Sequence, residues 1–205
     1  EMISANDSQF GDVDLAAFAA HGAIESLSLS NAQVTDISPL ASVPTIRQLH
    51  LWGDETRVYD FGFLAGSPVF DTLGVNANQV SGLNDLLALP ALTRLWTNGL
   101  TAADVTLLAS GLPATMELIS FSWSLQIGDA QLAEIVAAFP DLLHLEIVGT
   151  NVTDLTPVFG LAQLEQLHLD FIPMPDDVQA NDLRGLGVVV FGDAAGGVPI
   201  ADAID

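Results

Sequence analysis

The chain has 205 residues, a formal net charge of −22, four arginines and no lysine. Nucleic acids and acidic membrane surfaces attract clustered Lys and Arg, so this charge excludes both as partners and favours a basic protein surface instead. The absence of cysteine excludes disulfides, thiolate zinc sites and a cysteine nucleophile. No stretch reaches the roughly 18 uninterrupted apolar residues that a membrane-spanning helix needs, so we expect no membrane insertion.

The excess of acidic residues also has a second explanation. Aspartates keep an apolar-rich fold soluble, either in a secreted protein or in a salt-adapted cell. The lack of cysteine fits an exported protein of a Gram-positive bacterium as well as a cytosolic protein.

The first regular pattern in the chain spans residues 12–21. Leu15 and Phe18 lie on one face of a helical pattern, acidic residues occupy its first turn, and Gly22 follows its end. We expect residues 1–23 to form an N-terminal cap, in which an amphipathic helix covers the open end of the core.

From residue 24 onward, apolar residues recur in the pattern L-x-x-L-x-L. The eight triplets are Ile24/Leu27/Leu29, Ile46/Leu49/Leu51, Phe70/Leu73/Val75, Leu92/Leu95/Thr97, Met116/Ile119/Phe121, Leu142/Leu145/Ile147, Leu164/Leu167/Leu169 and Leu186/Val189/Phe191. Their starts lie 22 to 26 residues apart, and only Thr97 breaks the apolar pattern. Each triplet is typical of a short strand whose coil cannot bury its own apolar face, so stacked coils over residues 24–192 share one core.

Two segments of this array, residues 27–43 and 145–161, match position by position. After each strand, apolar residues follow at spacings of three: Val34, Ile37, Leu40 and Val43 in one segment, and Val152, Leu155, Val158 and Leu161 in the other. In these features the chain resembles the internalin-like leucine-rich repeats of bacteria over residues 24–191. The resemblance implies an α/β fold, a right-handed, curved solenoid with a parallel concave β-sheet of about eight strands.

The chain departs from this family at the position where the repeats carry Asn. Asn78 fits the pattern, but the equivalent residues in other repeats are Ala32, Leu100, Ser124 and Thr150. We therefore expect no continuous ladder of Asn side chains, and some turns must satisfy their backbone amides in another way.

The segments that return from one strand to the next differ in length. Residues 102–111 and 129–139 are long and helix-like, and Pro140 stops the second helix. We expect a convex side that mixes helical and irregular returns. After the last repeat no capping helix is evident, and residues 193–205 are assigned to a C-terminal tail.

Side chains alternate across a strand, so the residues around the second and third apolar positions point away from the core onto the concave face. They form three columns: Ser26, Gln48, Thr72, Arg94, Leu118, His144, Gln166 and Val188; Ser28, His50, Gly74, Trp96, Ser120, Glu146, His168 and Val190; and Ser30, Trp52, Asn76, Asn98, Ser122, Val148, Asp170 and Gly192. Interaction-prone residues are concentrated in these columns, as is typical of a binding face.

The first candidate site on this face contains two tryptophans. Trp52 and Trp96 lie two repeats apart with Gly74 between them, and they could form the walls of a slot roughly 10 Å wide. Alternatively, the two rings lie flat on the sheet and cover Gly74. The other predicted binding residues of this cluster are His50, Arg94 and Asn98.

The second candidate site is a patch formed by His144, Glu146, His168 and Asp170 on neighbouring repeats. Two imidazoles and two carboxylates could hold a divalent metal. Imidazoles beside carboxylates on an open sheet are more commonly a hydrogen-bonded polar patch, so we assign these residues to binding and expect no metal or other cofactor.

Catalytic signatures such as H-E-x-x-H, G-x-S-x-G and G-x-x-x-x-G-K-[ST] are missing. We expect no enzymatic activity, and we interpret the chain as a protein-binding domain of an exported or cell-surface bacterial protein, with the concave face contacting a protein or another macromolecule. The alternatives are a cytoplasmic interaction protein that neutralises a basic toxin domain, a structural spacer in a larger surface protein, and a metal-dependent enzyme.

Overall fold

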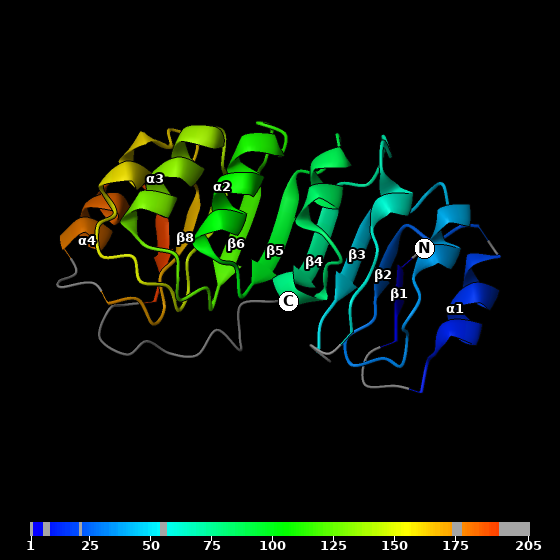
Figure 1. Ribbon diagram of the computed structural model, residues 1–205. Helices are drawn as coiled ribbons and strands as arrows, with labels where there is room; N and C mark the ends of the chain where they lie inside the picture. Colours follow the sequence, from blue (N-terminus) through cyan, green and yellow to red (C-terminus); the bar gives the residue numbers. More distant parts are fainter. Residues whose placement is uncertain (1, 6–8, 21, 54–56, 174–177, 193–205) are drawn as a thin grey trace.

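The computed structural model describes residues 2–5, 9–20, 22–53, 57–173 and 178–192. Within these residues, nine strands form one open parallel sheet, and their order in the sheet follows their order in the chain (Figure 1). The strands are β1 (Met2–Ser4), β2 (Ser26–Ser28), β3 (Gln48–Leu51), β4 (Thr72–Asn76), β5 (Arg94–Asn98), β6 (Leu118–Ser122), β7 (His144–Glu146), β8 (Gln166–His168) and β9 (Val189–Phe191). The predicted α/β solenoid is confirmed. The predicted tail, residues 193–205, lies outside the described residues.

The segments between the strands are partly helical. The α-helices are α1 (Asp12–Ala19), α2 (Ala102–Gly111), α3 (Asp129–Ala138) and α4 (Val178–Gly185), and the 3₁₀ helices are η1 (Ser38–Ser42), η2 (Gly62–Leu64), η3 (Ala77–Gln79), η4 (Leu83–Ala88) and η5 (Thr156–Gly160). Helices α2, α3 and α4 lie on one face of the sheet (Figure 1). The predicted mixture of helical and tighter returns is confirmed. In the described part of the chain, every helix is too short or too polar to cross a membrane.

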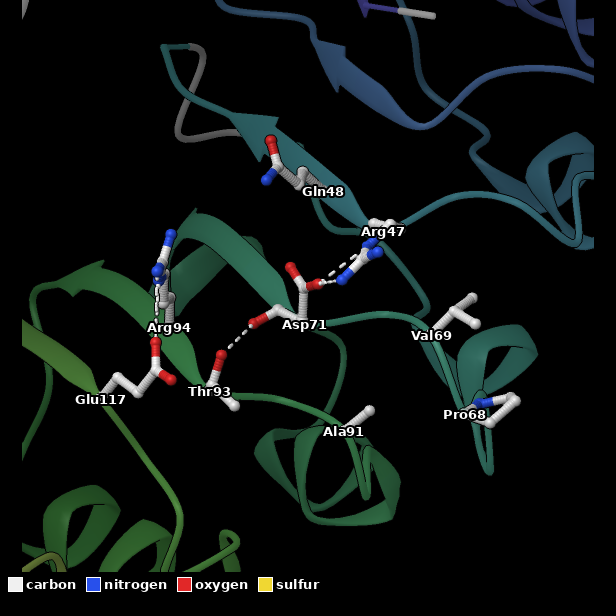
Figure 2. Close-up of a pocket in the computed structure, with 9 residues that line it drawn as sticks. All are labelled: Arg47, Gln48, Pro68, Val69, Asp71, Ala91, Thr93, Arg94 and Glu117. Atoms are coloured by element: carbon white, nitrogen blue, oxygen red, sulfur yellow. Dashed lines mark hydrogen bonds and ion pairs between the residues drawn. The ribbon is translucent and has the colours of Figure 1, made fainter. Parts of the chain in front are cut away.

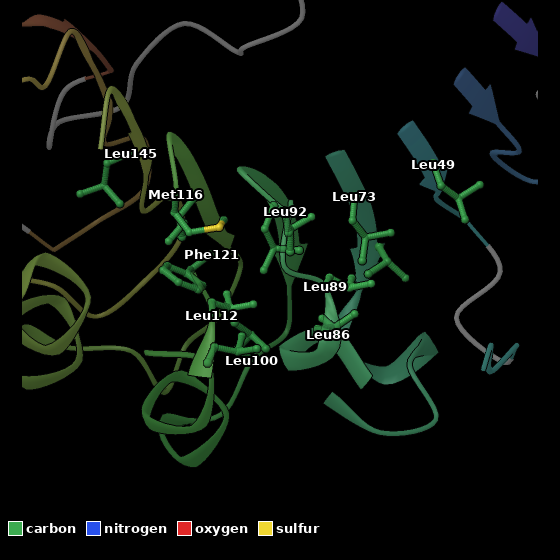
Figure 3. Packing of buried hydrophobic residues seen from close by; sticks show 14 of the residues in the cluster. Leu49, Leu73, Leu86, Leu89, Leu92, Leu100, Leu112, Met116, Phe121 and Leu145 are labelled. Atoms are coloured by element: carbon green, nitrogen blue, oxygen red, sulfur yellow. The ribbon is translucent and has the colours of Figure 1, made fainter. Parts of the chain in front are cut away.

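The strands stack in register, so that one residue from each coil reaches the same level of the core. This central column contains Leu27, Leu49, Leu73, Leu95, Ile119, Leu145 and Leu167, all of them fully buried. Figure 3 shows leucines of neighbouring coils packed side by side. Complete burial of a Leu side chain contributes roughly 1.5–3 kcal/mol, so the shared column stabilises the stacking of the coils.

The sheet begins one strand earlier than the repeat pattern indicated. β1 pairs in parallel with β2 and places Ile3 opposite Leu27. The predicted helix follows as α1, which buries Leu15 and Ala19 and packs against η1. The additional strand was missed because three residues are too few to reveal a period.

The predicted register of the last coil is wrong by one residue. β9 pairs Val190, rather than Val189, with Leu167 of β8. Leu186 is 71% exposed and Val189 is 51% exposed, so neither lies in the core. The last coil is one residue longer than we predicted from Val189, and this difference places Phe191 in the groove on the open face of the sheet.

The prediction that Asn78 occupies an Asn-ladder position is also wrong, because its side chain is exposed. Short hydroxyl side chains carry out this role in other coils. The buried Ser124 hydroxyl accepts a hydrogen bond from the Leu100 amide at 3.0 Å. The Thr150 hydroxyl donates a hydrogen bond to the Ile147 carbonyl at 2.8 Å. These bonds satisfy polar backbone groups inside the turns, where water cannot reach them.

Two carboxylates join neighbouring coils. Asp12 accepts hydrogen bonds from the amide and the hydroxyl of Thr35, both at 2.7 Å, and from the Asp36 amide at 3.0 Å. Asp129 makes the same set of bonds to Thr153 and to the residue after it. Hydrogen bonds from the Thr35 side chain and amide lower the pKa of Asp12. Part of the acidic composition therefore has a structural role.

Candidate functional site

The open face of the sheet carries a groove with a volume of about 690 Å³. Its lining residues are Ser28, His50, Trp52, Trp96, Leu118, His144, Glu146, Gln166, His168 and Phe191. They stand on strands from β2 to β9, or directly after a strand, at positions that point away from the core because side chains alternate across a strand. Aromatic and imidazole rings dominate this lining, which we call the concave groove.

The concave groove unites residues of both predicted clusters. His50, Trp52, Trp96, His144, Glu146 and His168 line it. The groove is not lined by the other predicted residues, Arg94, Asn98 and Asp170. Asp170 is almost completely buried after β8, Asn98 ends β5, and Arg94 lines a different pocket. Phe191 was missed because of the register error in the last coil.

The slot predicted between Trp52 and Trp96 is not present. A Cβ atom added to Gly74 would lie 2.5 Å from Nδ1 of His50 and 2.9 Å from Cζ2 of Trp52, so these two rings already cover the glycine. The His50 ring also contacts Trp96, with centroids 5.7 Å apart and planes tilted by 52°. We call these three rings the aromatic row. Gly74 is covered, as in the alternative considered from the sequence, but by His50 and Trp52 rather than by the two tryptophans.

The aromatic row depends on the absence of a side chain at Gly74. A larger residue there would overlap the rings of His50 and Trp52 and displace them from the sheet. Burial lowers the pKa of His50, so its imidazole is neutral at pH 7 and adds to the apolar surface.

The other end of the concave groove is more polar. His168 stacks on Phe191 with centroids 4.3 Å apart and planes 21° apart. Burial lowers the pKa of His168, and His144 acts in the same direction, although the nearby carboxylates of Glu146 and Asp170 oppose the shift. Among the described residues, no group of three or more His, Cys, Asp or Glu side chains is arranged to hold a metal ion.

Arg94 belongs to a second pocket of about 590 Å³, near the first residues of β3 to β6. Figure 2 shows the Arg94 side chain turned toward Glu117. Nη2 of Arg94 lies 3.2 Å from Oε2 of Glu117. In the same pocket Arg47 contacts Asp71 at 2.6 Å. Arg94 does not line the concave groove with the tryptophans, and its guanidinium pairs with the carboxylate of Glu117 on the adjacent coil. Its role in binding stays a prediction.

Two further exposed aromatic residues were not among the predicted site residues. Trp123 and Phe171 follow β6 and β8 and do not line the concave groove. The sequence does contain a signal for them, since they stand where equivalent turns carry Gly53, Gly99 and Gly149.

Comparisons with known proteins identify the fold. No family model and no curated protein matches the chain. Among solved structures, an internalin of Listeria monocytogenes matches with a TM-score of 0.63 and 19% sequence identity, over 94% of this chain and 54% of that one. The chain has the leucine-rich repeat fold of the internalins. It spans about half the length of that internalin.

Two further structures are similar to a smaller degree. Internalin C2 of Listeria monocytogenes matches with a TM-score of 0.47 and 19% identity, over 98% of this chain and 74% of that one. A leucine-rich repeat protein of Leptospira interrogans matches with a TM-score of 0.45 and 13% identity, over 92% of this chain and 59% of that one.

Proposed function

We propose that the chain is a non-enzymatic protein-binding domain and that the concave groove contacts its partner. The observation that carries this proposal is the row of Trp52, His50 and Trp96, which stays partly exposed on the open face of the sheet. A row of rings held against the sheet loses little conformational entropy when a partner covers it, and for this reason aromatic residues are frequent in binding hot spots.

The partner that fits this groove has both apolar and basic side chains. Apolar side chains of the partner pack on the aromatic row, while its Lys or Arg side chains pair with the carboxylate of Glu146 at the more polar end of the groove. The net charge of −22 draws a basic surface toward the chain and repels an acidic one.

We place this function outside the cell or on the cell surface of a bacterium. The internalin-like fold supports this location over the cytoplasmic alternative. The aromatic row favours a binding domain over a structural spacer, because a spacer does not need partly exposed aromatic rings on its open face.

The decisive experiment is the substitution Trp96→Ala. An unbiased pull-down with the wild-type chain first identifies the partner, and its affinity is then measured by calorimetry. Truncation of a central aromatic costs about 2 kcal/mol or more of binding energy, so we expect Trp96→Ala to weaken the complex at least about tenfold.

Phe159→Ala is the matched control, because Phe159 is a partly exposed aromatic residue on η5, away from the concave groove. It should bind like the wild type. Equal affinities of the Trp96→Ala and Phe159→Ala variants, both folded, would refute recognition through the groove.

A further inference from the structure

The turns that follow the strands share an unusual backbone conformation. In most described coils, the second residue after the last core-facing strand position has a positive φ. These residues are Asn31 (φ 53°), Gly53 (118°), Gly99 (70°), Trp123 (55°), Gly149 (65°) and Phe171 (61°). Gly and Asn tolerate this left-handed region, whereas a bulky side chain at positive φ is a genuine outlier.

Trp123 and Phe171 are the two outliers of this set, and they contact one another. Their ring centroids lie 5.3 Å apart, with planes tilted by 31°. Gly149 of the intervening coil lies beneath Trp123, since a Cβ atom added there would be 2.6 Å from the indole. The two rings therefore bridge three consecutive coils at the rim of the sheet. We call this pair the rim aromatics.

The backbone of this turn does not require aromatic side chains. The Trp123 amide donates to the Val148 carbonyl at 2.7 Å, and the Asn31 amide makes the equivalent bond to the Trp52 carbonyl at 2.8 Å. A residue without a bulky side chain thus keeps the same hydrogen bond. Both rim aromatics are 56% exposed, so they leave most of their apolar surface to solvent. Strained, exposed aromatic residues of this kind are concentrated at functional sites.

The charge of the coils that carry the rim aromatics selects the kind of partner. Residues 95–192 contain twelve acidic residues and a single basic one, Arg184. Arg184 is engaged on α4, where it donates to the Asn181 side chain and to the Val190 carbonyl. The face of an aromatic ring attracts a cation, and the net negative charge of this part of the chain strengthens that attraction. A second copy of the chain would bring the same negative charge and be repelled.

We infer that Trp123 and Phe171 form a second contact surface, separate from the concave groove, which binds Lys or Arg side chains of a basic protein partner through cation–π interactions. The intervening Gly149 lets the indole lie against the backbone, and both rim aromatics keep more than half of their surface exposed. Contacts at this rim extend the area available to a partner beyond the groove itself.

The test uses variants that keep the charge and suit the backbone. Trp123→Gly and Phe171→Gly remove the rings and relieve the left-handed strain, and Trp123→Asn repeats the first change with another residue that tolerates positive φ. Phe159→Ala is the matched aromatic control on the convex side. The probe is a fluorescein-labelled peptide of alternating Gly and Lys, with its acetyl-lysine counterpart as the uncharged reference, and affinity is measured by fluorescence anisotropy at low salt.

Each rim variant should bind the Gly-Lys peptide about three- to tenfold more weakly than the wild type, as expected for the loss of one cation–π contact. The Phe159→Ala variant should match the wild type, and the acetylated peptide should bind all variants weakly and equally. Unchanged affinity in all rim variants would overturn the inference.

Two other outcomes would also overturn it in distinguishable ways. A loss of peptide affinity in Trp96→Ala but in no rim variant would place the cation in the concave groove, in agreement with the proposed function. Self-association of the wild type in sedimentation, abolished by Trp123→Gly, would instead make a second copy the occupant of the rim.

Discussion

Burial distinguishes leucines that occupy similar places in the repeat pattern. Leu145 is fully buried between Ile119 and Leu167, whereas Leu186 is 71% exposed beside the turn after α4. Leu145→Ala should therefore cost about 2–5 kcal/mol of unfolding free energy, because it leaves a cavity in the shared column. Leu186→Ala should change stability by less than about 0.5 kcal/mol. Urea unfolding measures both, and similar losses for the two variants would contradict the register of the last coil.

The same residues show how far the sequence leads. The period of L-x-x-L-x-L predicts the strands after β1, the core column as far as Leu167 and the side of the sheet that stays open, because all three depend only on alternation and spacing. It does not predict whether Trp52 stands upright or covers Gly74, since that depends on contacts between coils. The apolar period also does not predict that Trp123 adopts a positive φ. The signal for that lies in the glycines that occupy the equivalent position in other turns.

At the scale of the elements, carboxylates that bridge coils stabilise the stacking of one return on the next. Asp129 lies at the start of α3 and binds the amides of Thr153 and Asp154 in the following coil. Burial alone would raise the pKa of Asp129, but the hydrogen bonds from Thr153 and Asp154 outweigh it and lower the pKa below 3.8. The folded chain thus binds fewer protons than the unfolded one at acidic pH.

Asp129→Ala should destabilise the protein by about 1 kcal/mol at pH 7, because three hydrogen bonds to a charged acceptor are lost. This contribution is fully present above pH 3.8 and is lost as the pH falls through the lower pKa of the folded state. Asp141→Ala is the matched control, since it removes the same charge from an exposed position. Denaturant unfolding of both variants at pH 7 and near pH 3 checks the prediction, which fails if their stabilities are equal at pH 7.

The whole molecule carries a net charge of −22, so its acidic side chains repel one another across an open, elongated surface. The exposed ion pairs Arg47–Asp71 and Arg94–Glu117 offset little of this repulsion, because exposed salt bridges contribute at most about 1 kcal/mol each. Salt screens both the repulsion between acidic side chains and the attraction within the ion pairs, with a Debye length of about 8 Å at physiological ionic strength. Because the repulsive pairs are far more numerous, screening removes more repulsion than attraction. The melting temperature should therefore rise as sodium chloride is added from low to moderate concentration, by about 2–4 °C for each kcal/mol of repulsion removed. Scanning calorimetry over this range provides the measurement, with sucrose as an uncharged control. A melting temperature that falls steadily with salt would mean that attractive pairs dominate, and it would contradict self-repulsion among the acidic side chains of the folded protein.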